Sequence, residues 1–383
     1  MEKFEGLLDR VRVRELSQME AAEILGMSER TFRRWRVRYE AEGLEGLFDR
    51  RLDKASGRRV PVDEIAWVIE QYRTRHVGWT VKHFHDYLTA HHGFRLGYTW
   101  TKTQLHGAGL VRKAPRRGAH RRRRPRQPLV GMMVHQDGST HAWLEGQAPL
   151  DLIVTLDDAT SEIYSAFLVA EEGTASSFSG LLKVIAAKGL PCALYTDRAS
   201  HYFHTPEAGA KVDKDKPSQV GRALAQLGIE HIAAYSPQAR GRSERAFATL
   251  QDRLVNELGL AAITTVEAAN RFIAEVYLPD HNARFAKPPE QSESAFVPAT
   301  LAQVQDILCR QEERIVGNDN TVRYHGLSLQ IPPSPIRPHF VKARVRVHEY
   351  PDAGLAVFHG PRRLASYTAA GELITNTNTR LAA

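Results

Sequence analysis

The sequence contains little cysteine: Cys192 and Cys309 are the only two in 383 residues. Two isolated cysteines match neither a disulfide framework nor a zinc-binding spacing, which agrees with a reducing cytoplasm. No apolar run is long enough to span a bilayer, and the charged start MEKFEGLLDR does not resemble a secretory signal. The sequence also lacks a glycine-rich phosphate loop, a nucleotide motif and a Ser/His/Asp set. We therefore expect a cytoplasmic chain with no membrane partner.

The excess of positive charge is confined to one short segment. Residues 112–126 hold nine Lys or Arg and no acid, whereas residues 1–111 carry a net +3 and residues 127–383 a net −4. Like charges repel and prolines interrupt helix, so we expect residues 112–127 to form a linker. Cations at this density displace counterions from phosphates, which favours nucleic acid as a partner over an inert spacer or targeting signal. The expected phosphate contacts are Arg116, Arg117, Arg121, Arg122, Arg123 and Arg124.

Residues 1–55 carry the pattern of a helix-turn-helix DNA-binding domain. Ser17 and Glu20 form a capping box, Gly26 ends that helix, and Ser28 is placed to cap a second one. The aromatic residues of the second helix share one face, while its arginines project elsewhere. Such a helix enters the major groove, although a helical hairpin with a solvated charged face is the alternative. The expected DNA contacts are Arg30, Arg33, Arg34 and Arg36.

A second helix-turn-helix domain is expected over residues 60–111. Helices are predicted at 63–75, 79–91 and 98–109, with Lys102 on the last as a DNA contact. Four of the histidines in this region could suggest a zinc site, but no cysteine is near them and a structural zinc site needs four placed ligands. We therefore expect surface or groove-facing roles for His83, His85, His91 and His92.

Between residues 128 and 298 the pattern changes to mixed α/β. Strands are predicted at 129–137, 151–158, 162–172 and 192–196, with a helix at 174–189. Asp137 and Asp197 end two of these strands. Glu244 lies at the edge of a helix's apolar stripe, near its start. Carboxylates at such positions can converge on a pair of divalent cations, which catalyse attack at phosphorus.

Five strings then carry a resemblance to a known family: HQDGS, TLDDATSEIYSAF, YTDRASHY, YSPQARGRSERAFATLQDRL and YLPDHNARFAKPPEQS. In this order they resemble insertion-sequence transposases of the DDE class, whose core is shared with retroviral integrases. The resemblance covers about residues 10–300. It implies a multidomain chain of all-α helix-turn-helix units, an RNase H-like α/β core and a small C-terminal β-barrel. The separation of Asp197 from Glu244 exceeds that of many relatives, which indicates an insertion around residues 204–219.

The resemblance also implies an activity. Asp137 would bridge two Mg²⁺ or Mn²⁺ ions, with Asp197 and Glu244 each holding one, and these three residues would be catalytic. The protein would bind terminal inverted repeats in double-stranded DNA, cut the element ends and join the 3′-hydroxyls to target DNA. It would act as a homo-oligomer, at least a dimer, at the bacterial nucleoid. The alternatives are a DNA-binding transcriptional regulator with an inactive integrase-like core, and a nuclease without joining activity.

Several polar residues near the three carboxylates have other expected roles. Asp157 and Asp158 precede Ala159, and we expect them to cap a turn rather than bind metal. His201 is a candidate for orienting substrate. The arginines around Glu244 are expected phosphate contacts, with surface solvation as the alternative: Arg240, Arg242 and Arg245.

Residues 310–375 show short alternating strands separated by turn signals, the pattern expected of the small β-barrel. Lys342, Arg344 and Arg346 alternate along one predicted strand and so should share a face. That face is expected to contact DNA or another subunit.

Overall fold

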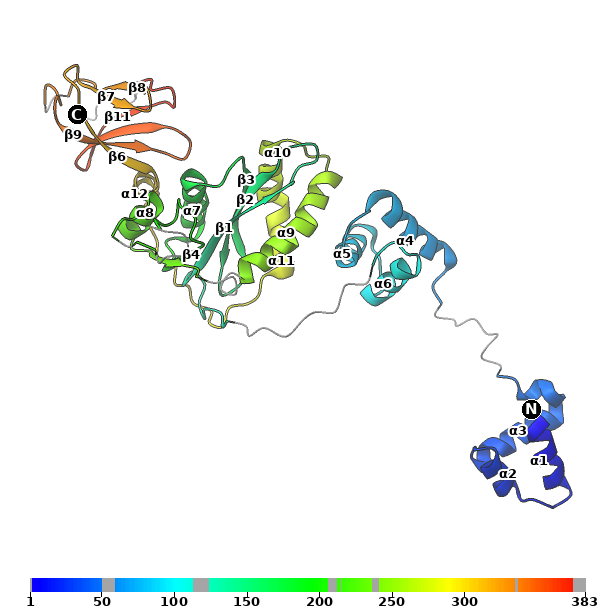
Figure 1. The fold of residues 1–383 in the computed structure, drawn as a ribbon. Helices are drawn as coiled ribbons and strands as arrows, with labels where there is room; N and C mark the ends of the chain where they lie inside the picture. Colours follow the sequence, from blue (N-terminus) through cyan, green and yellow to red (C-terminus); the bar gives the residue numbers. More distant parts are fainter. Residues whose placement is uncertain are drawn as a thin grey trace, which may run out of the picture. The chain divides into compact units, whose positions relative to one another are not determined.

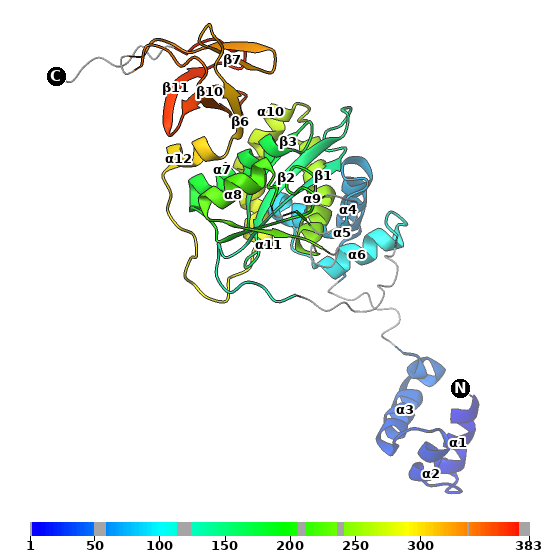
Figure 2. The same ribbon diagram turned by 60° about the vertical axis from the view of Figure 1, so that its left-hand side comes forward.

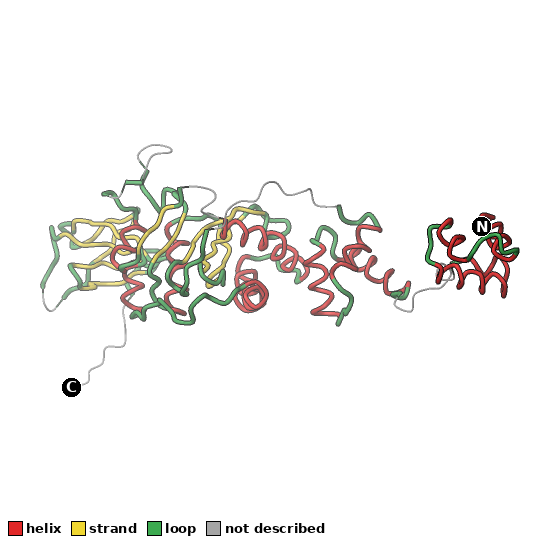
Figure 3. The backbone as a smooth tube through the Cα atoms, turned by 90° about the horizontal axis from the view of Figure 1, so that it is seen from below, coloured by secondary structure: helices red, strands yellow, loops and turns green. Residues whose placement is uncertain are grey.

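The computed structural model forms two compact units, residues 1–75 and 76–383. It describes residues 2–49, 59–112, 124–205, 212–213, 215–235, 241–334 and 337–374. Figure 3 shows that the strands gather in the second unit, whereas the first unit is helical. Among the described helices, none is long and apolar enough to cross a membrane. Most of the basic linker lies outside the described residues, as does part of the expected insertion.

The first unit confirms the predicted helix-turn-helix signals. Its elements are α1 (Glu2–Arg12), α2 (Gln18–Ile24), α3 (Glu29–Glu42), the 3₁₀ turn η1 (Gly43–Leu47) and α4 (Val62–Arg75). The capping box is present, since the Ser17 hydroxyl accepts from the Glu20 amide and the Glu20 carboxylate accepts from the Ser17 amide. The Ser28 hydroxyl accepts from the Thr31 amide at 3.2 Å and so caps α3.

Helix α1, which the sequence pattern did not predict, supplies the centre of this small core. The Phe4 ring lies 5.4 Å from Phe32, 5.7 Å from Trp35 and 5.9 Å from Tyr39 between ring centroids. The three aromatic residues of α3 therefore share one face, as predicted. Arg30, Arg33 and Arg34 are exposed on the same helix, so α3 presents a basic surface to solvent.

The predicted helices of residues 60–111 are also found. Besides α4, they are α5 (Val81–His92) and α6 (Tyr98–Gly107) in the second unit. Thr80 caps α5 by accepting from the His83 amide, and Gly93 ends it in the left-handed conformation. Lys102 is exposed on α6.

The core of the second unit is a five-stranded mixed sheet in the order β3-β2-β1-β4-β5. The first three strands pair antiparallel, and β1, β4 and β5 pair parallel. This is the strand arrangement expected for an RNase H-like core. The strands are β1 (Val134–His141), β2 (Leu150–Asp157), β3 (Ile163–Val169), β4 (Ala193–Thr196) and β5 (Glu230–Ala233).

Helices cover both faces of this sheet (Figure 1). One layer consists of α7 (Thr174–Lys188) and α8 (Gln219–Leu227). The other begins with α9 (Gly241–Leu260) and α10 (Val266–Phe272), and continues through the π-helical turn η3 (Ile273–Tyr277) into α11 (Leu278–Phe285). Each layer buries its own apolar cluster, so the sheet separates two cores.

Two details of the core differ from the sequence prediction. Strand β1 starts at Val134 instead of residue 129, because Gly131 adopts a left-handed φ of +79° and breaks the extended run. A Cβ at Gly131 would lie 2.6 Å from the Phe296 ring, so the turn also depends on glycine. Helix α8 and strand β5 were not predicted, although Ser218 caps α8 through the Gly221 amide.

The C-terminal region does not form the predicted β-barrel. After α12 (Leu301–Ile307), strands β6 (Arg310–Ile315), β9 (Arg344–Glu349), β10 (Leu355–His359) and β11 (Arg362–Tyr367) form an open sheet in the order β11-β10-β9-β6. A separate hairpin of β7 (Thr321–Tyr324) and β8 (Leu327–Gln330) packs on it through a shared apolar cluster (Figure 2). No pairing of described residues joins the two edge strands, so the sheet is not closed. The β7–β8 hairpin covers the apolar face of this sheet, which closure into a barrel would otherwise have buried.

The basic residues of β9 follow the prediction only in part. Arg344 and Arg346 are both exposed and alternate with the buried Val345 and Val347. Lys342 precedes the strand in a left-handed conformation with φ +59°, so the alternation does not extend to it.

Replacing Phe4 by Ala should destabilise the first helical domain by about 3–5 kcal/mol, because it removes the ring that three aromatic side chains surround. Hydrogen exchange of α3 amides in the full-length chain should report this loss. Phe48→Ala is the control, since Phe48 is 57% exposed. Equal loss of protection in both variants would contradict this account of the core.

Candidate active site

Strand β1 directs alternate side chains to the two helical layers. Gln136 faces α7, where its amide donates to the Ser177 carbonyl at 3.1 Å. Ser139 faces α9, where its hydroxyl accepts from Gln251 at 3.0 Å. Asp137 lies on the Ser139 side by this alternation and is 6% exposed. The first predicted carboxylate therefore lies under the N-terminal half of α9.

Asp197 follows directly after β4, the parallel neighbour of β1. The ladder sets Val134 opposite Leu194 and His135 opposite Tyr195. The ladder ends before the two acids, since β4 stops at Thr196, but Asp137 and Asp197 each lie two residues beyond the paired His135 and Tyr195. The Asp197 carboxylate also accepts from the Ala199 amide at 2.9 Å, which holds the chain as it leaves the strand.

Glu244 lies in the first turn of α9 and is exposed. It shares a helix face with Gln251, which is seven residues later, so both point towards β1. The first turn of α9 lies near the start of β1, because Arg242 on α9 and His135 on β1 contact the same carboxylate, that of Asp158.

The structure thus brings the three predicted carboxylates to one face and one end of the sheet. It does not bring their side chains into a single cluster: among the described residues no group of three or more His, Cys, Asp or Glu side chains could hold a metal ion. Carboxylates of like charge repel one another, and a cation would offset that repulsion. The donor set at this face consists of carboxylate oxygens, the ligands that Mg²⁺ and Mn²⁺ prefer.

A fourth acid, Glu172, approaches this place from the α7 side. A Cβ at Gly138 would lie 2.2 Å from the Glu172 Oε2, so the glycine next to Asp137 leaves room for that carboxylate. His201 turns towards the same group, with its Nε2 3.6 Å from the Glu172 Oε1. The sequence offered no local signal for Glu172, because it follows β3 in a run of ordinary surface residues.

Tyr202 is a second residue that the sequence analysis missed. Its ring is buried, and its hydroxyl donates to Gln136 at 3.1 Å and accepts from Ser177 at 3.2 Å. Burial, and then the charges of Glu172, Asp137 and Asp197, raise the pKa of this phenol well above its usual value. Tyr202 therefore stays neutral, and its hydrogen bond to Gln136 supports β1 next to Asp137.

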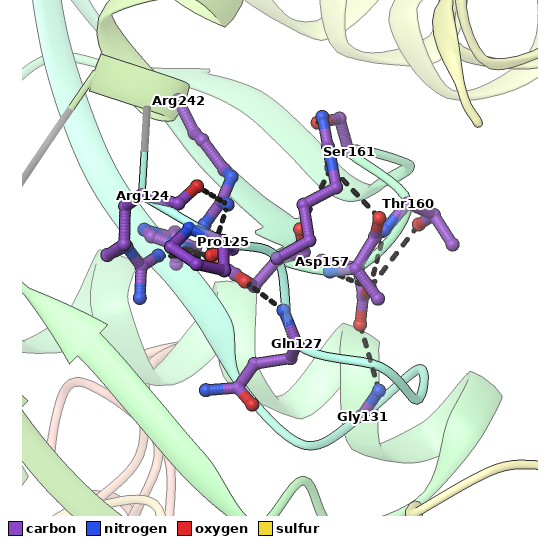
Figure 4. A network of polar contacts seen from close by, with 12 residues as sticks. Arg124, Pro125, Gln127, Gly131, Asp157, Thr160, Ser161 and Arg242 are labelled. Carbon is purple, nitrogen blue, oxygen red and sulfur yellow. Dashed lines mark hydrogen bonds and ion pairs between the residues drawn. The ribbon is translucent and has the colours of Figure 1, made fainter. Parts of the chain in front are cut away.

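The two acids predicted to cap a turn behave differently from each other (Figure 4). Asp157 does cap the turn: its Oδ1 accepts from the amides of Ala159 and Thr160, and its Oδ2 accepts from Gly131. The same prediction is wrong for Asp158. Its buried carboxylate pairs with Arg124 and Arg242 and accepts from the Gln127 amide at 2.8 Å.

His135 completes the surroundings of Asp158. Its Nε2 lies 2.7 Å from the Asp158 Oδ1, and an ionised carboxylate only accepts, so this nitrogen carries the proton. Burial raises the pKa of Asp158, but the hydrogen bonds from His135 and Gln127 and the nearby positive charges outweigh it and lower the pKa to about 2. Burial also lowers the pKa of His135 against the opposing effect of Asp158.

The expected DNA contacts fall into three groups. Arg30, Arg33, Arg34 and Lys102 are exposed, and Arg36 is half-buried beside Glu40. Arg242 and Arg124 both pair with the buried carboxylate of Asp158, and of the two Arg124 is exposed. Outside the described residues lie Arg116, Arg117, Arg121, Arg122, Arg123 and Arg240.

Comparisons with known proteins give a domain-family match near the N-terminus and two relatives that are named transposases. Residues 12–66 match the winged helix-turn-helix family. The protein named "Putative transposase y4bF" of Sinorhizobium fredii is 30% identical over 347 residues, which cover 89% of this chain and 75% of the relative. The transposase for insertion sequence IS1202 of Streptococcus pneumoniae is 32% identical over 201 residues, covering 52% of this chain and 43% of the relative.

Solved structures of retroviral integrases also match, at lower similarity. The catalytic core domain of HTLV-2 integrase in complex with magnesium is 15% identical over 37% of this chain and 82% of its own, with a TM-score of 0.30. The simian T-cell lymphotropic virus intasome is 17% identical over 82% of this chain, with a TM-score of 0.32.

The low pKa of Asp158 predicts a pH-dependent contribution to stability. Its folded pKa of about 2 lies below the usual 3.8, so the stabilisation is complete above pH 4 and is lost as the pH falls towards 2. The difference in unfolding free energy between the wild type and Asp158→Asn should therefore shrink by up to about 2 kcal/mol between pH 6 and pH 2. Urea denaturation at several pH values measures it. A difference that stays constant would contradict the ionised, paired carboxylate.

Proposed function

Because the chain belongs to the family of insertion-sequence transposases, we propose that it binds the terminal inverted repeats of an element, cuts the DNA there and joins the freed 3′-hydroxyls to target DNA. One observation carries the catalytic part of this proposal. Asp137 and Asp197 each lie two residues beyond the paired His135 and Tyr195 of neighbouring parallel strands, and the contact between Gln251 and Ser139 supports a place for Glu244 on the same face. Three carboxylates on one face of the sheet suit phosphodiester chemistry, which needs negative charge offset at the reacting oxygens.

The three carboxylates would hold Mg²⁺ or Mn²⁺, with two ions per site. Bound there, the metal would supply Lewis-acid activation of the attacking oxygen and stabilisation of the leaving oxygen. The protein's own contribution is positional. Strands β1 and β4 hold the two aspartates on rigid neighbouring backbones, and α9 holds Glu244 through its buried stripe. The exposed Glu244 side chain retains the freedom to turn towards the aspartates.

The N-terminal helices would select the DNA. Helix α3 exposes its arginines on the surface opposite the aromatic core, where they can reach base edges and phosphates in a major groove. The basic residues near 112–126 would add phosphate contacts along the duplex. Joining two ends to one target requires at least two protomers, so we propose a dimer or larger assembly on paired ends.

Replacing any of the three carboxylates by its amide should abolish cleavage and joining while DNA binding persists. Changes to the surroundings of a metal site already cost roughly 10–100-fold in activity, so loss of a ligand should cost more. Asp137→Asn, Asp197→Asn and Glu244→Gln would be compared with Glu267→Gln, an exposed acid on α10. Cleavage of labelled terminal-repeat DNA with Mg²⁺ measures the first step and a joined product the second.

The outcomes of that assay separate the candidate activities. Full activity in any one of the three amide variants contradicts the assigned trio. Tight end binding by the wild type without any cut or joined product would favour a transcriptional regulator with an inactive core. Cut ends without joined product would favour a nuclease.

Replacing Arg30 and Arg34 by Ala should weaken binding to all DNA sequences, most strongly at low salt, and reduce the salt dependence. Each lost phosphate contact lowers the slope of log K against log salt by about 0.9, so the double variant should lose up to about 2. Arg10→Ala is the control, since Arg10 lies on α1 in an ion pair with Glu15. An unchanged slope, with binding lost only for the terminal repeat, would assign these arginines to base recognition alone.

A further inference from the structure

Asp158 draws together three segments that are far apart in the sequence. Its side chain is 0% exposed, yet it is a charged carboxylate with partners on every side. His135 comes from β1, Arg242 from the first turn of α9, and Arg124 and Gln127 from the end of the basic segment. A buried carboxylate persists only where such partners surround it. These partners therefore fix the position of each segment relative to the others.

Two of these contacts, His135 and Arg242, each lie two residues before a predicted catalytic carboxylate, and a neighbour of the network does so for the third. On β1, His135 precedes Asp137 and shares its face. On α9, Arg242 precedes Glu244. On β4, Tyr195 precedes Asp197, and its ring packs 4.9 Å from His135 and 5.8 Å from the Arg124 guanidinium. The residues of the network thus lie two positions before the three carboxylates on their respective elements, at the same end of the sheet.

Arg242 is the link that fixes the start of α9. Besides its pairing with Asp158, it donates to the carbonyl oxygens of Arg124 at 3.1 Å and Pro125 at 2.8 Å (Figure 4). Arg126 then ties the same segment to the β2–β3 turn, donating to the carbonyls of Asp158 and Ala159. The first turn of α9 and the end of the basic segment therefore share one anchor.

We propose that Asp158 is a positioning residue for the DNA-cutting reaction: through Arg242 it sets the first turn of α9, and hence Glu244, against Asp137 and Asp197. The effect on DNA cutting rests on the proposed function, whereas the effect on the position of the first turn of α9 does not. Because Asp158 is fully buried among protein partners, its role is to position other residues. It acts by fixing the first turn of α9, which carries Glu244, while Gln251 fixes the same helix two turns later.

The test compares Asp158→Asn with Asp157→Asn in the full-length protein. Asp157 is the matched control because it is equally buried and adjacent, and caps its turn without contacting Arg242 or Arg124. Hydrogen exchange should show the amides in the first two turns of α9 exchanging at least tenfold faster in Asp158→Asn, with α7 unchanged. Asp157→Asn should leave α9 exchange as in the wild type.

The same variants are then assayed for single-turnover cleavage of terminal-repeat DNA at saturating DNA. Asp158→Asn should cut about 10–100-fold more slowly per folded molecule and need a higher Mg²⁺ concentration for half-maximal rate, with DNA affinity within twofold. A purely structural role would lower the folded fraction without moving the Mg²⁺ midpoint. Asp157→Asn should retain the wild-type rate per folded molecule.

Arg242→Gln keeps the contacts of Asp158 with His135 and Arg124, so it tests the link if Asp158→Asn does not fold. It should reproduce the faster exchange at the start of α9, whereas Arg124→Gln should not. Wild-type exchange and a wild-type Mg²⁺ midpoint in both Asp158→Asn and Arg242→Gln overturn the proposal. If the wild type itself does not cut DNA, the proposed function fails, and the exchange comparison still decides what Asp158 positions.

Discussion

The alternation of side chains along β1 is the constraint on which the candidate site depends. One face of the strand carries Gln136 and Gly138 against α7, and the other carries His135, Asp137 and Ser139 against α9. A slip of one residue would exchange the two faces and turn Asp137 away from α9. Gln136 opposes such a slip, because its buried amide bonds to Thr155, Ser177 and Tyr202 at once. The side chains on one face thus hold the acids on the other in place.

The buried charge of Asp158 adds a second, longer-range constraint. A single carboxylate binds two arginines, Arg124 and Arg242, that are 118 residues apart in the chain. Leaving either that anion or its arginine partners unpaired in the interior would be costly, so the segments fold together. This explains how α9, which is separated from β4 by α8 and β5, packs at a defined place beside β1. It also explains why the last residues of the basic segment belong structurally to the core.

Local signals in the sequence predicted the elements well, and pairings between distant segments poorly. The capping box at Ser17 and Glu20, the aromatic face around Phe32 and the apolar stripe behind Glu244 are all set by residues within one or two turns. Asp157 and Asp158 are adjacent and look alike in sequence, yet only Asp157 caps the turn, because Arg242 and His135 reach the other from elsewhere. The predicted barrel failed for the same reason, since closure depends on which edges meet and not on how each strand alternates.

The proposed function requires that Asp137, Asp197 and Glu244 converge on a metal where the sheet meets the start of α9. The most direct measurement is anomalous scattering from Mn²⁺ in crystals of the protein bound to terminal-repeat DNA. The account predicts anomalous peaks bounded by the carboxylate oxygens of these three residues and by a DNA phosphate. Mn²⁺ bound at other residues, with Glu244 directed away from Asp137, would contradict it.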